Sequence, residues 1–429
     1  MKINTKVMSY EEVLKLPRLQ HKKPKKPQSW LTTIIYIVSV ITLRKTKFSY
    51  TEERMDLVKG KPCLILMNHS SFTDMKLAYM IFYPKKFGII TSVDAMTGIL
   101  GKLMRLIGCT PTHKYITDLS LISDIRYMLK ENKVSVLMYP EGGYSFDGCA
   151  TAMQKNYGIL MKRLKVPVVT VITQGAFHRD PLYNMLQIRD VKVSAHVKCI
   201  ATEEEIREKS VEELDALVEE AFSFDNFAWQ KKNKVSVDAP FRADGLQRIL
   251  YKCPHCKEEN QMEGTGIILT CHSCKKQWIM DEYGQMSAKS DHTEYSHIPD
   301  WYQWQRECVR KELEEGTYLL DTKVEIGMQV NLDYICMVGE GRLIHSLDGF
   351  HLIGAEGKLD YIQSPVFSHT LYSDYYWYEI GDMIGIGDNE FSYFCFPKDN
   401  ISVTKVRLAT EELYKMKKIR KEKKKENKI

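Results

Sequence analysis

Short apolar runs alternate with amphipathic stretches through the first half of the chain. The apolar runs lie at 62–67, 87–93, 134–138, 166–173 and 191–200. The stretches with helical spacing lie near 72–83, 96–107, 119–130, 152–164 and 203–222. Strands that alternate with helices form a mostly parallel sheet with helices on both faces. We therefore expect an α/β domain over residues 51–240.

The pattern changes near residue 317. Short alternating runs between Gly and Asp turns predict several strands as far as about residue 407, and a charged helix is expected near 409–426. The aromatic-rich stretch at 372–380 is interpreted as core packing rather than as a ligand site. Several strands followed by one helix resemble a pleckstrin-homology-like barrel in element order alone. The sequence predicts a β-rich domain at 317–429, after an ordered connector at 286–316.

The most hydrophobic segment, residues 30–43, carries no charge and lies between two basic clusters. Its length is short of the roughly 20 residues that span a bilayer as a helix. Thr32, Tyr36 and Ser39 fall on one helical stripe and aliphatic residues on another, which predicts a helix lying in the membrane interface. A buried core helix is the alternative. We assign residues 1–50 to a basic arm that contains this helix.

Composition adds an uneven charge. The chain of 429 residues has a net charge of +6, and residues 415–429 hold nine Lys or Arg and two Glu. This tail is either a solvated helix or a contact to anionic lipids, worth about 1 kcal/mol per basic residue near the surface. Cysteines outside the CxxC pairs lie in apolar contexts, as buried thiols of a reducing compartment do. We expect a peripheral or monotopic protein at the cytoplasmic face of a membrane.

Two CxxC pairs lie between residues 241 and 285. They are Cys253 with Cys256 and Cys271 with Cys274, separated by 14 residues. Four thiolates at this spacing form a closed structural zinc site, which leaves no position open for catalysis. Nearby lysines and aromatic residues allow a nucleic-acid contact as an alternative. We expect a zinc ribbon at 241–285 that supports structure or docking, and no nucleic-acid partner.

A histidine and a carboxylate follow the first apolar run. His69 and Asp74 lie in the sequence NHSSFTD. Histidine suits proton transfer near neutral pH, and a neighbouring carboxylate fixes its tautomer. Sites in α/β sheets form at the carboxyl ends of strands, so the pair predicts a catalytic site. The alternative is a capping box in which Ser71 is the N-cap and Asp74 the N3 residue.

A second polar motif, YPEGGYS, follows the run at 134–138. Pro140 ends the strand, Glu141 lies at its carboxyl end, and Gly142 and Gly143 let backbone amides approach a ligand. The segments at 68–74, 139–145 and 166–169 thus place polar groups after successive buried strands. Metal ligation by the histidine is disfavoured, because no second His or Glu lies at ligand spacing.

In this order the segments resemble the 1-acylglycerol-3-phosphate acyltransferase family of phospholipid synthesis. The family's Asn-His-x-Ser-x-x-Asp block matches 68–74. Its Phe-Pro-Glu-Gly-Thr-Arg-Ser block matches at Pro140, Glu141, Gly142 and Ser145, and its Val-Pro-Val-Val block matches 166–169. The resemblance covers about residues 30–230. It implies that His69 is the general base, that Asp74 orients it, and that Glu141 and the Gly142–Gly143 turn help to hold the acceptor.

Two positions depart from the family pattern. The arginine that meets an acceptor phosphate in relatives is Tyr144 here, and the nearest equivalent of the second-block arginine lies at Thr112-His113-Lys114. Lys114 can meet a phosphate as a point charge, although it lacks the planar fork of arginine. The alternative is an ordinary solvated lysine. The acyl-transfer residues are retained, and the acceptor headgroup stays open.

The sequence therefore predicts an acyltransferase that acts at a membrane surface. It moves a fatty acyl group from an activated donor, which is acyl-CoA, acyl carrier protein or acyl phosphate, to a hydroxyl of a lysophospholipid. The reaction needs a base and backbone amides for the oxyanion, and no catalytic metal. A catalytically idle lipid-binding scaffold, which recruits partners through its zinc ribbon and β-rich domain, is the alternative function.

Overall fold

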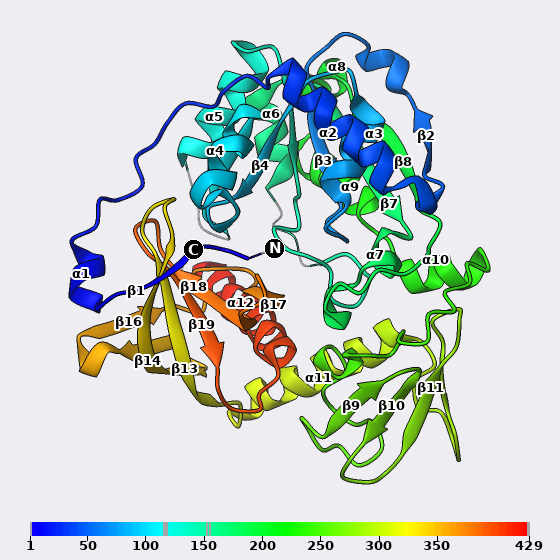
Figure 1. Ribbon diagram of the computed structural model, residues 1–429, viewed down its shortest axis with the longest axis vertical. Helices are drawn as coiled ribbons and strands as arrows, with labels where there is room; N and C mark the ends of the chain where they lie inside the picture. Colours follow the sequence, from blue (N-terminus) through cyan, green and yellow to red (C-terminus); the bar gives the residue numbers. More distant parts are fainter. Residues whose placement is uncertain (1, 115–118, 152, 154–155, 427–429) are drawn as a thin grey trace.

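A sheet of strand order β2-β8-β7-β3-β6-β4-β5 forms the centre of the N-terminal half (Figure 1). The computed structural model describes residues 2–114, 119–151, 153 and 156–426. The strands are β2 (Ser49–Glu53), β3 (Leu64–Met67), β4 (Phe87–Ser92), β5 (Cys109–Thr112), β6 (Ser135–Met138), β7 (Val168–Gln174) and β8 (Ser194–Ala201). Every neighbouring pair is parallel except β7 and β8. The predicted mostly parallel sheet is confirmed.

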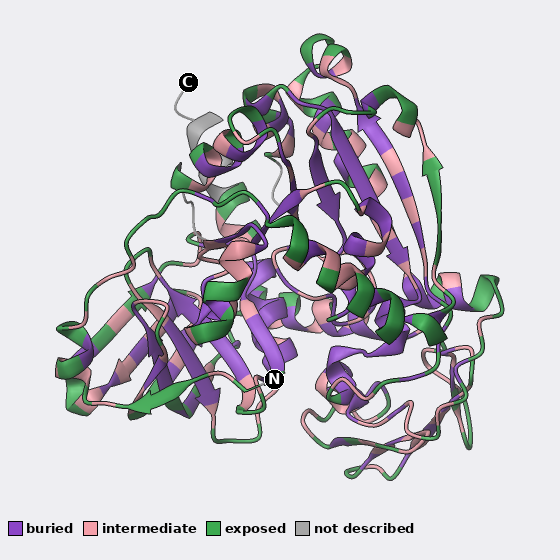
Figure 2. Ribbon diagram, turned by 45° about the horizontal axis from the view of Figure 1, so that its top comes forward, coloured by how far each residue is buried: buried purple, intermediate pink, exposed green. Residues whose placement is uncertain are grey.

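Helices cover both faces of this sheet. They are α2 (Ser29–Thr42), α3 (Asp74–Phe82), α4 (Gly98–Leu106), α5 (Leu119–Lys130), α6 (Tyr157–Leu164), α7 (Ala176–Arg179), α8 (Glu203–Glu208), α9 (Val211–Ala221) and α10 (Asn226–Lys232). Successive side chains of β3 point to opposite faces, so Ile65 packs with residues of α3 and Leu66 with residues of α5, α6 and α9. Figure 2 shows the inner strands buried and the edge strand β2 exposed.

The prediction of a single helix at 203–222 is wrong. Two helices, α8 and α9, lie there, because Ser210 starts a new helix. Its hydroxyl accepts a hydrogen bond from the Glu213 amide, and the Glu213 carboxylate accepts one from the Ser210 amide. The helix expected from 152 begins at Tyr157, and residues 152, 154 and 155 lie outside the described residues.

A four-stranded antiparallel sheet of order β12-β11-β10-β9 carries the CxxC pairs. Its strands are β9 (Met262–Thr265), β10 (Ile268–Cys271), β11 (Gln277–Met280) and β12 (Met286–Ala288). Helix α11 (Ile298–Glu315) follows, and the indole of Trp301 on it donates to the carbonyl of Lys252 at 3.0 Å. This helix links the ribbon to the C-terminal sheet (Figure 1).

The C-terminal region is β-rich and ends in one helix, as predicted. Its strand order is β16-β15-β14-β13-β19-β18-β17, with antiparallel neighbours. The strands are β13 (Leu320–Gln329), β14 (Ile335–Ser346), β15 (Gly349–Gly354), β16 (Leu359–Gln363), β17 (Tyr372–Trp377), β18 (Gly381–Gly387) and β19 (Ser392–Pro397). Helix α12 (Val403–Glu426) packs against α11 and β17. The end of the basic tail expected at 415–429 lies outside the described residues.

The N-terminal segment adds to the C-terminal sheet. Strand β1 (Thr5–Val7) pairs in parallel with β14, and α1 (Tyr10–Leu14) follows it before the chain crosses to α2 (Figure 1). The sequence pattern did not predict this pairing. The segment that we assigned to the basic arm therefore contacts more than one part of the molecule. The domain boundaries drawn from the sequence stay predictions.

The C-terminal sheet lies beside the carboxyl ends of β4 and β5. The amide of Gln329 on β13 donates to the Thr97 hydroxyl at 3.0 Å, and the Gly98 amide donates to the carbonyl of Leu332 at 2.7 Å. The hydroxyl of Tyr372 on β17 donates to Asp94, which follows β4, at 3.0 Å. This contact brings the β-rich region to the edge of the sheet where α/β proteins build their sites.

Helix α2 buries polar residues and exposes apolar ones, the reverse of an ordinary surface helix. The polar residues Thr32 and Ser39 are buried, whereas Trp30, Ile34 and Ile41 are exposed. Within the described part of the chain, no helix combines the length and the hydrophobicity that crossing a bilayer requires. The exposed apolar stripe of α2 therefore lies on the surface of the described structure.

Candidate active site

Strands β3 and β6 are parallel neighbours, so the loops that follow them meet. His69 lies in the loop between β3 and α3, and Glu141 lies in the loop after β6. The His69 amide donates to Glu141 Oε1 at 2.9 Å, and the Ser145 amide donates to the His69 carbonyl at 3.0 Å. The structure thus brings His69, Asp74 and Glu141 into one site at the carboxyl ends of the strands.

The imidazole of His69 is bonded to the carboxylate of Asp74. His69 Nδ1 lies 2.9 Å from Asp74 Oδ2, and the same oxygen accepts the amides of Ser70 at 2.8 Å and Ser71 at 3.0 Å. Because two backbone donors already point at Oδ2, this oxygen acts as an acceptor and Nδ1 carries the hydrogen. The lone pair of the imidazole is then on Nε2, which is the arrangement that a general base needs.

The capping box offered as an alternative is only half formed. The Asp74 carboxylate accepts the Ser71 amide, but the Ser71 hydroxyl accepts the amide of Thr73 at 3.1 Å instead of capping the Asp74 amide. Helix α3 begins at Asp74, and its N-cap Thr73 makes no side-chain cap bond. The Ser71 hydroxyl also donates to the buried carboxylate of Asp180, a contact that the sequence did not predict.

Burial and charge keep the imidazole of His69 neutral. Burial lowers its pKa well below the usual value, and the nearby Lys114 cation lowers it further. Burial raises the pKa of Asp74, while the amides of Ser71 and Ser70 oppose that rise. A neutral imidazole with a free Nε2 can accept a proton at physiological pH.

Two tyrosine rings enclose the His69 ring. Its centroid lies 4.0 Å from that of Tyr139 and 3.9 Å from that of Tyr144, and Phe72 stacks on the outer face of Tyr144 at 4.9 Å. The side chain of His69 keeps 17% of its surface exposed. With a ring on each side, the exposed part of the imidazole is at its edge. Sequence reasoning noted Tyr144 as a departure from the family and missed its contact with the histidine.

The carboxylate of Glu141 is hydrogen-bonded to two separate segments of the chain. Oε1 accepts the His69 amide and Oε2 accepts the Thr151 amide, each at 2.9 Å, and the residue is fully buried. Burial raises its pKa to about 7, against these amide bonds. Gly142 has a φ of 67° and donates its amide to the Tyr139 carbonyl at 3.0 Å, so the turn before buried Gly143 needs a glycine.

Lys114 lies between the two halves of the molecule. Its Nζ is 3.8 Å from the ring centroid of Tyr372 on β17. Burial lowers its pKa, whereas Asp94 and Asp374 nearby raise it. The structure therefore contradicts an ordinary solvated lysine. Whether Lys114 meets a substrate phosphate stays a prediction.

Four cysteines in the region of the β9–β12 sheet form a cluster. Their sulfur atoms all lie within 4.8 Å of one another, with 3.8 Å between Cys253 and Cys274 and 3.7 Å between Cys256 and Cys271. Zinc–sulfur bonds of about 2.3 Å in a tetrahedron place the sulfur atoms about 3.8 Å apart. The four residues thus fit a zinc ion. Four sulfur ligands would fill every position around the ion, so the site would stabilise the fold and take no part in chemistry at His69.

Comparison with known proteins matches part of the chain to a protein family. The acyltransferase family model matches residues 44–174, which include His69, Asp74, Lys114 and Glu141. The crystal structure of the 1-acyl-sn-glycerophosphate acyltransferase PlsC from Thermotoga maritima is similar at 19% identity with a TM-score of 0.37. That match covers 44% of this chain and 76% of that chain. The match to the family model shows that residues 44–174 are a domain of the acyltransferase family.

Proposed function

We propose that the chain transfers a fatty acyl group from an activated donor to a hydroxyl of a lysophospholipid, which is 1-acylglycerol-3-phosphate or a related acceptor. The proposal depends on one observation above all. Within the acyltransferase domain, His69 Nδ1 lies 2.9 Å from the buried carboxylate of Asp74, at the carboxyl end of β3. This pair supplies an oriented base, which is the group that acyl transfer to an alcohol requires.

In the proposed reaction, Nε2 of His69 takes the proton of the acceptor hydroxyl as its oxygen attacks the donor carbonyl. The C–O ester bond forms, the bond from the acyl carbon to the leaving group breaks, and the proton on Nε2 passes to that leaving group. The Asp74 carboxylate stabilises the transient imidazolium through Nδ1. A well-placed base contributes about 10²–10⁴-fold to such a step.

Helix α2 gives the proposed enzyme a route to lipid acceptors. Its exposed apolar stripe faces outward, and its inner side stacks on the end of α3, with 4.1 Å between the ring centroids of Tyr36 and Tyr83. Helix α3 begins at Asp74. A membrane that binds the stripe would therefore lie on the outer side of α2, with α3 packed on the inner side of the same helix. Free thiols throughout the chain support a cytoplasmic face.

Lys114 is our candidate for the acceptor phosphate. It is a cation close enough to His69 to lower the pKa of the imidazole. Asp94 and Asp374 share its surroundings and oppose the effect of burial on the pKa of Lys114.

Lipid mass spectrometry tests the function and identifies the acceptor. Cells that carry His69→Ala should accumulate one lysophospholipid class relative to cells with the wild-type chain, and the class that rises names the acceptor. A lipid profile that is unchanged, together with no turnover by purified wild-type protein on any of the three donor classes, would instead favour a lipid-binding scaffold.

A further inference from the structure

An arginine of the C-terminal helix reaches the loop that holds the candidate active site. Arg407 lies on α12, outside the matched acyltransferase domain, and its side chain is 3% exposed. Its Nη1 donates to the carbonyl of Tyr144 at 3.2 Å, and its guanidinium lies 4.4 Å from the ring centroid of Phe146. One cation therefore contacts the residues on both sides of Ser145.

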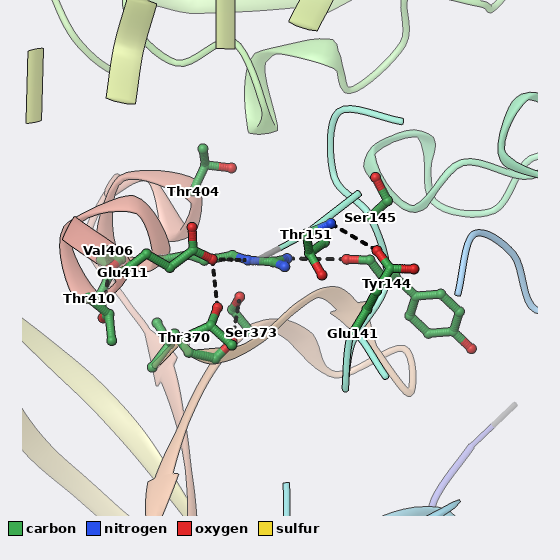
Figure 3. A network of polar contacts seen from close by, with 12 residues as sticks. Glu141, Tyr144, Ser145, Thr151, Thr370, Ser373, Thr404, Val406, Thr410 and Glu411 are labelled. Atoms are coloured by element: carbon green, nitrogen blue, oxygen red, sulfur yellow. Dashed lines mark hydrogen bonds and ion pairs between the residues drawn. The ribbon is translucent and has the colours of Figure 1, made fainter. Parts of the chain in front are cut away.

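The rest of the guanidinium is held from the other side. Its Nε donates to Glu411 Oε1 at 3.3 Å, and Glu411 also accepts a bond from Arg306 on α11 at 2.7 Å. The hydroxyl of Thr370 donates to Glu411 at 2.6 Å (Figure 3). Burial alone would raise the pKa of Glu411, but Arg306 and Arg407 bring it down to about 2. The carboxylate stays charged at any physiological pH, and it anchors Arg407 firmly.

The contacted loop acts directly on His69. The ring of Tyr144 packs against the imidazole at a tilt of 31°, and the next residue, Ser145, donates its amide to the His69 carbonyl. Figure 3 shows Tyr144, Glu141 and Thr151 on one side of this network and Glu411 with Thr370 on the other. A continuous series of contacts thus runs from α12 through Arg407 and Tyr144 to the imidazole.

We propose that Arg407 is a positioning residue, through which the C-terminal helix holds the 144–146 loop and so sets the orientation of His69. The consequence is that the β-rich region completes the active site, which the acyltransferase domain does not hold in place alone. The inference rests on the proposed function for its effect on rate. Its structural part concerns the His69 ring and stands apart from any activity.

The test uses the full chain labelled with ¹³C at the histidine ε1 carbon. The His69 resonance is assigned by its loss in His69→Asn, and its ring proton is expected to be shielded by the two tyrosines. Arg407→Gln should move or broaden this resonance and lower kcat about 10- to 100-fold, the scale expected when a base is misplaced by about 1 Å. Arg407→Lys should give an intermediate result, because lysine keeps the charge without the planar fork.

Arg310→Gln is the matched control. Arg310 is in the same ionic network, bonded to Glu412 at 2.8 Å, but it is 44% exposed and does not contact the loop in the described structure. The proposal is overturned if Arg407→Gln has no more effect on the His69 resonance and on kcat than Arg310→Gln has. It is also overturned if Arg407→Gln lowers kcat without changing the resonance. If Arg407→Gln does not fold, Arg407→Lys decides by the same two measurements. An inactive wild-type protein would refute the proposed function, and the resonance would still test the link to Arg407.

Discussion

The phenol ring of Tyr144 lies against the imidazole of His69, with 3.9 Å between the ring centroids and 31° between the ring planes. This contact occurs where the family pattern has an arginine that meets a phosphate. In our proposal, the side chain at this position supports the base instead of contacting substrate, and the acceptor approaches along the edge of the imidazole.

The stack predicts how substitutions of Tyr144 behave. Tyr144→Ala should lower kcat up to about tenfold, because an aromatic pair is worth about 0.5–1.5 kcal/mol beyond its buried area. Tyr144→Phe is the matched control and should stay close to wild type, since it keeps the ring. Steady-state kinetics on lysolipid vesicles measure both, and equal rates for the two variants would show that the stack does not support the base.

The charge of Lys114 predicts a change in pH dependence. His69 must be neutral to act as a base, so activity falls as the pH drops through its pKa, which burial and Lys114 place below the usual value. Lys114→Gln removes the cation and raises that pKa, so the acidic limb of the kcat profile should move to higher pH. Lys114→Arg keeps the charge and should leave the limb in place. If the acidic limb of the profile is unchanged in Lys114→Gln, the charge of Lys114 does not affect the pKa of His69.

The exposed stripe of α2 predicts membrane binding. Ile34→Asn and Ile41→Asn should each weaken binding to anionic vesicles about tenfold, since a buried aliphatic side chain is worth about 1.5–3 kcal/mol. Thermal stability should not fall, because both side chains are exposed. Ile362→Asn, at an exposed position of β16, is the control that should not affect sedimentation with vesicles. If all three variants bind vesicles equally well, α2 is not the part of the chain that contacts the membrane.

The cysteine cluster predicts a structural zinc ion. Purified protein should contain one equivalent of zinc by mass spectrometry of the metal, and Cys271→Ser should lose the metal and unfold at a lower temperature. Cys308→Ser changes a thiol outside the cluster and should keep both the metal and the stability. A metal-free wild-type protein of unchanged stability would contradict this site.

Local patterns were enough to predict the α/β sheet and the meeting of its loops. Buried strands such as β3 and β6 read as apolar runs, and parallel neighbours bring the residues after them together, so His69 and Glu141 could be expected at one edge. Asp74 begins the helix that follows the His69 loop, and a separation of five positions permits the 2.9 Å contact. The break between α8 and α9 was also readable, because Ser210 and Glu213 form a capping box in the sequence.

Contacts between distant segments could not be predicted in this way. Arg407 and Tyr144 are 263 residues apart, and nothing in the periodicity of α12 distinguishes this arginine from the other basic residues of the helix. Strand β1 is three residues long, too short to show alternation, and its pairing with β14 depends on the tertiary fold. The contact of Tyr144 with His69 likewise follows from two loops meeting rather than from either loop alone.

Turnover by purified His69→Ala tests the central claim most directly. The account predicts that this variant loses acyl transfer to the lysolipid by at least about 10²-fold, the lower end of what a positioned base contributes, while its zinc content and unfolding temperature match those of the wild-type chain. Undiminished transfer by a folded, zinc-containing His69→Ala protein would contradict the assignment of His69 as the base.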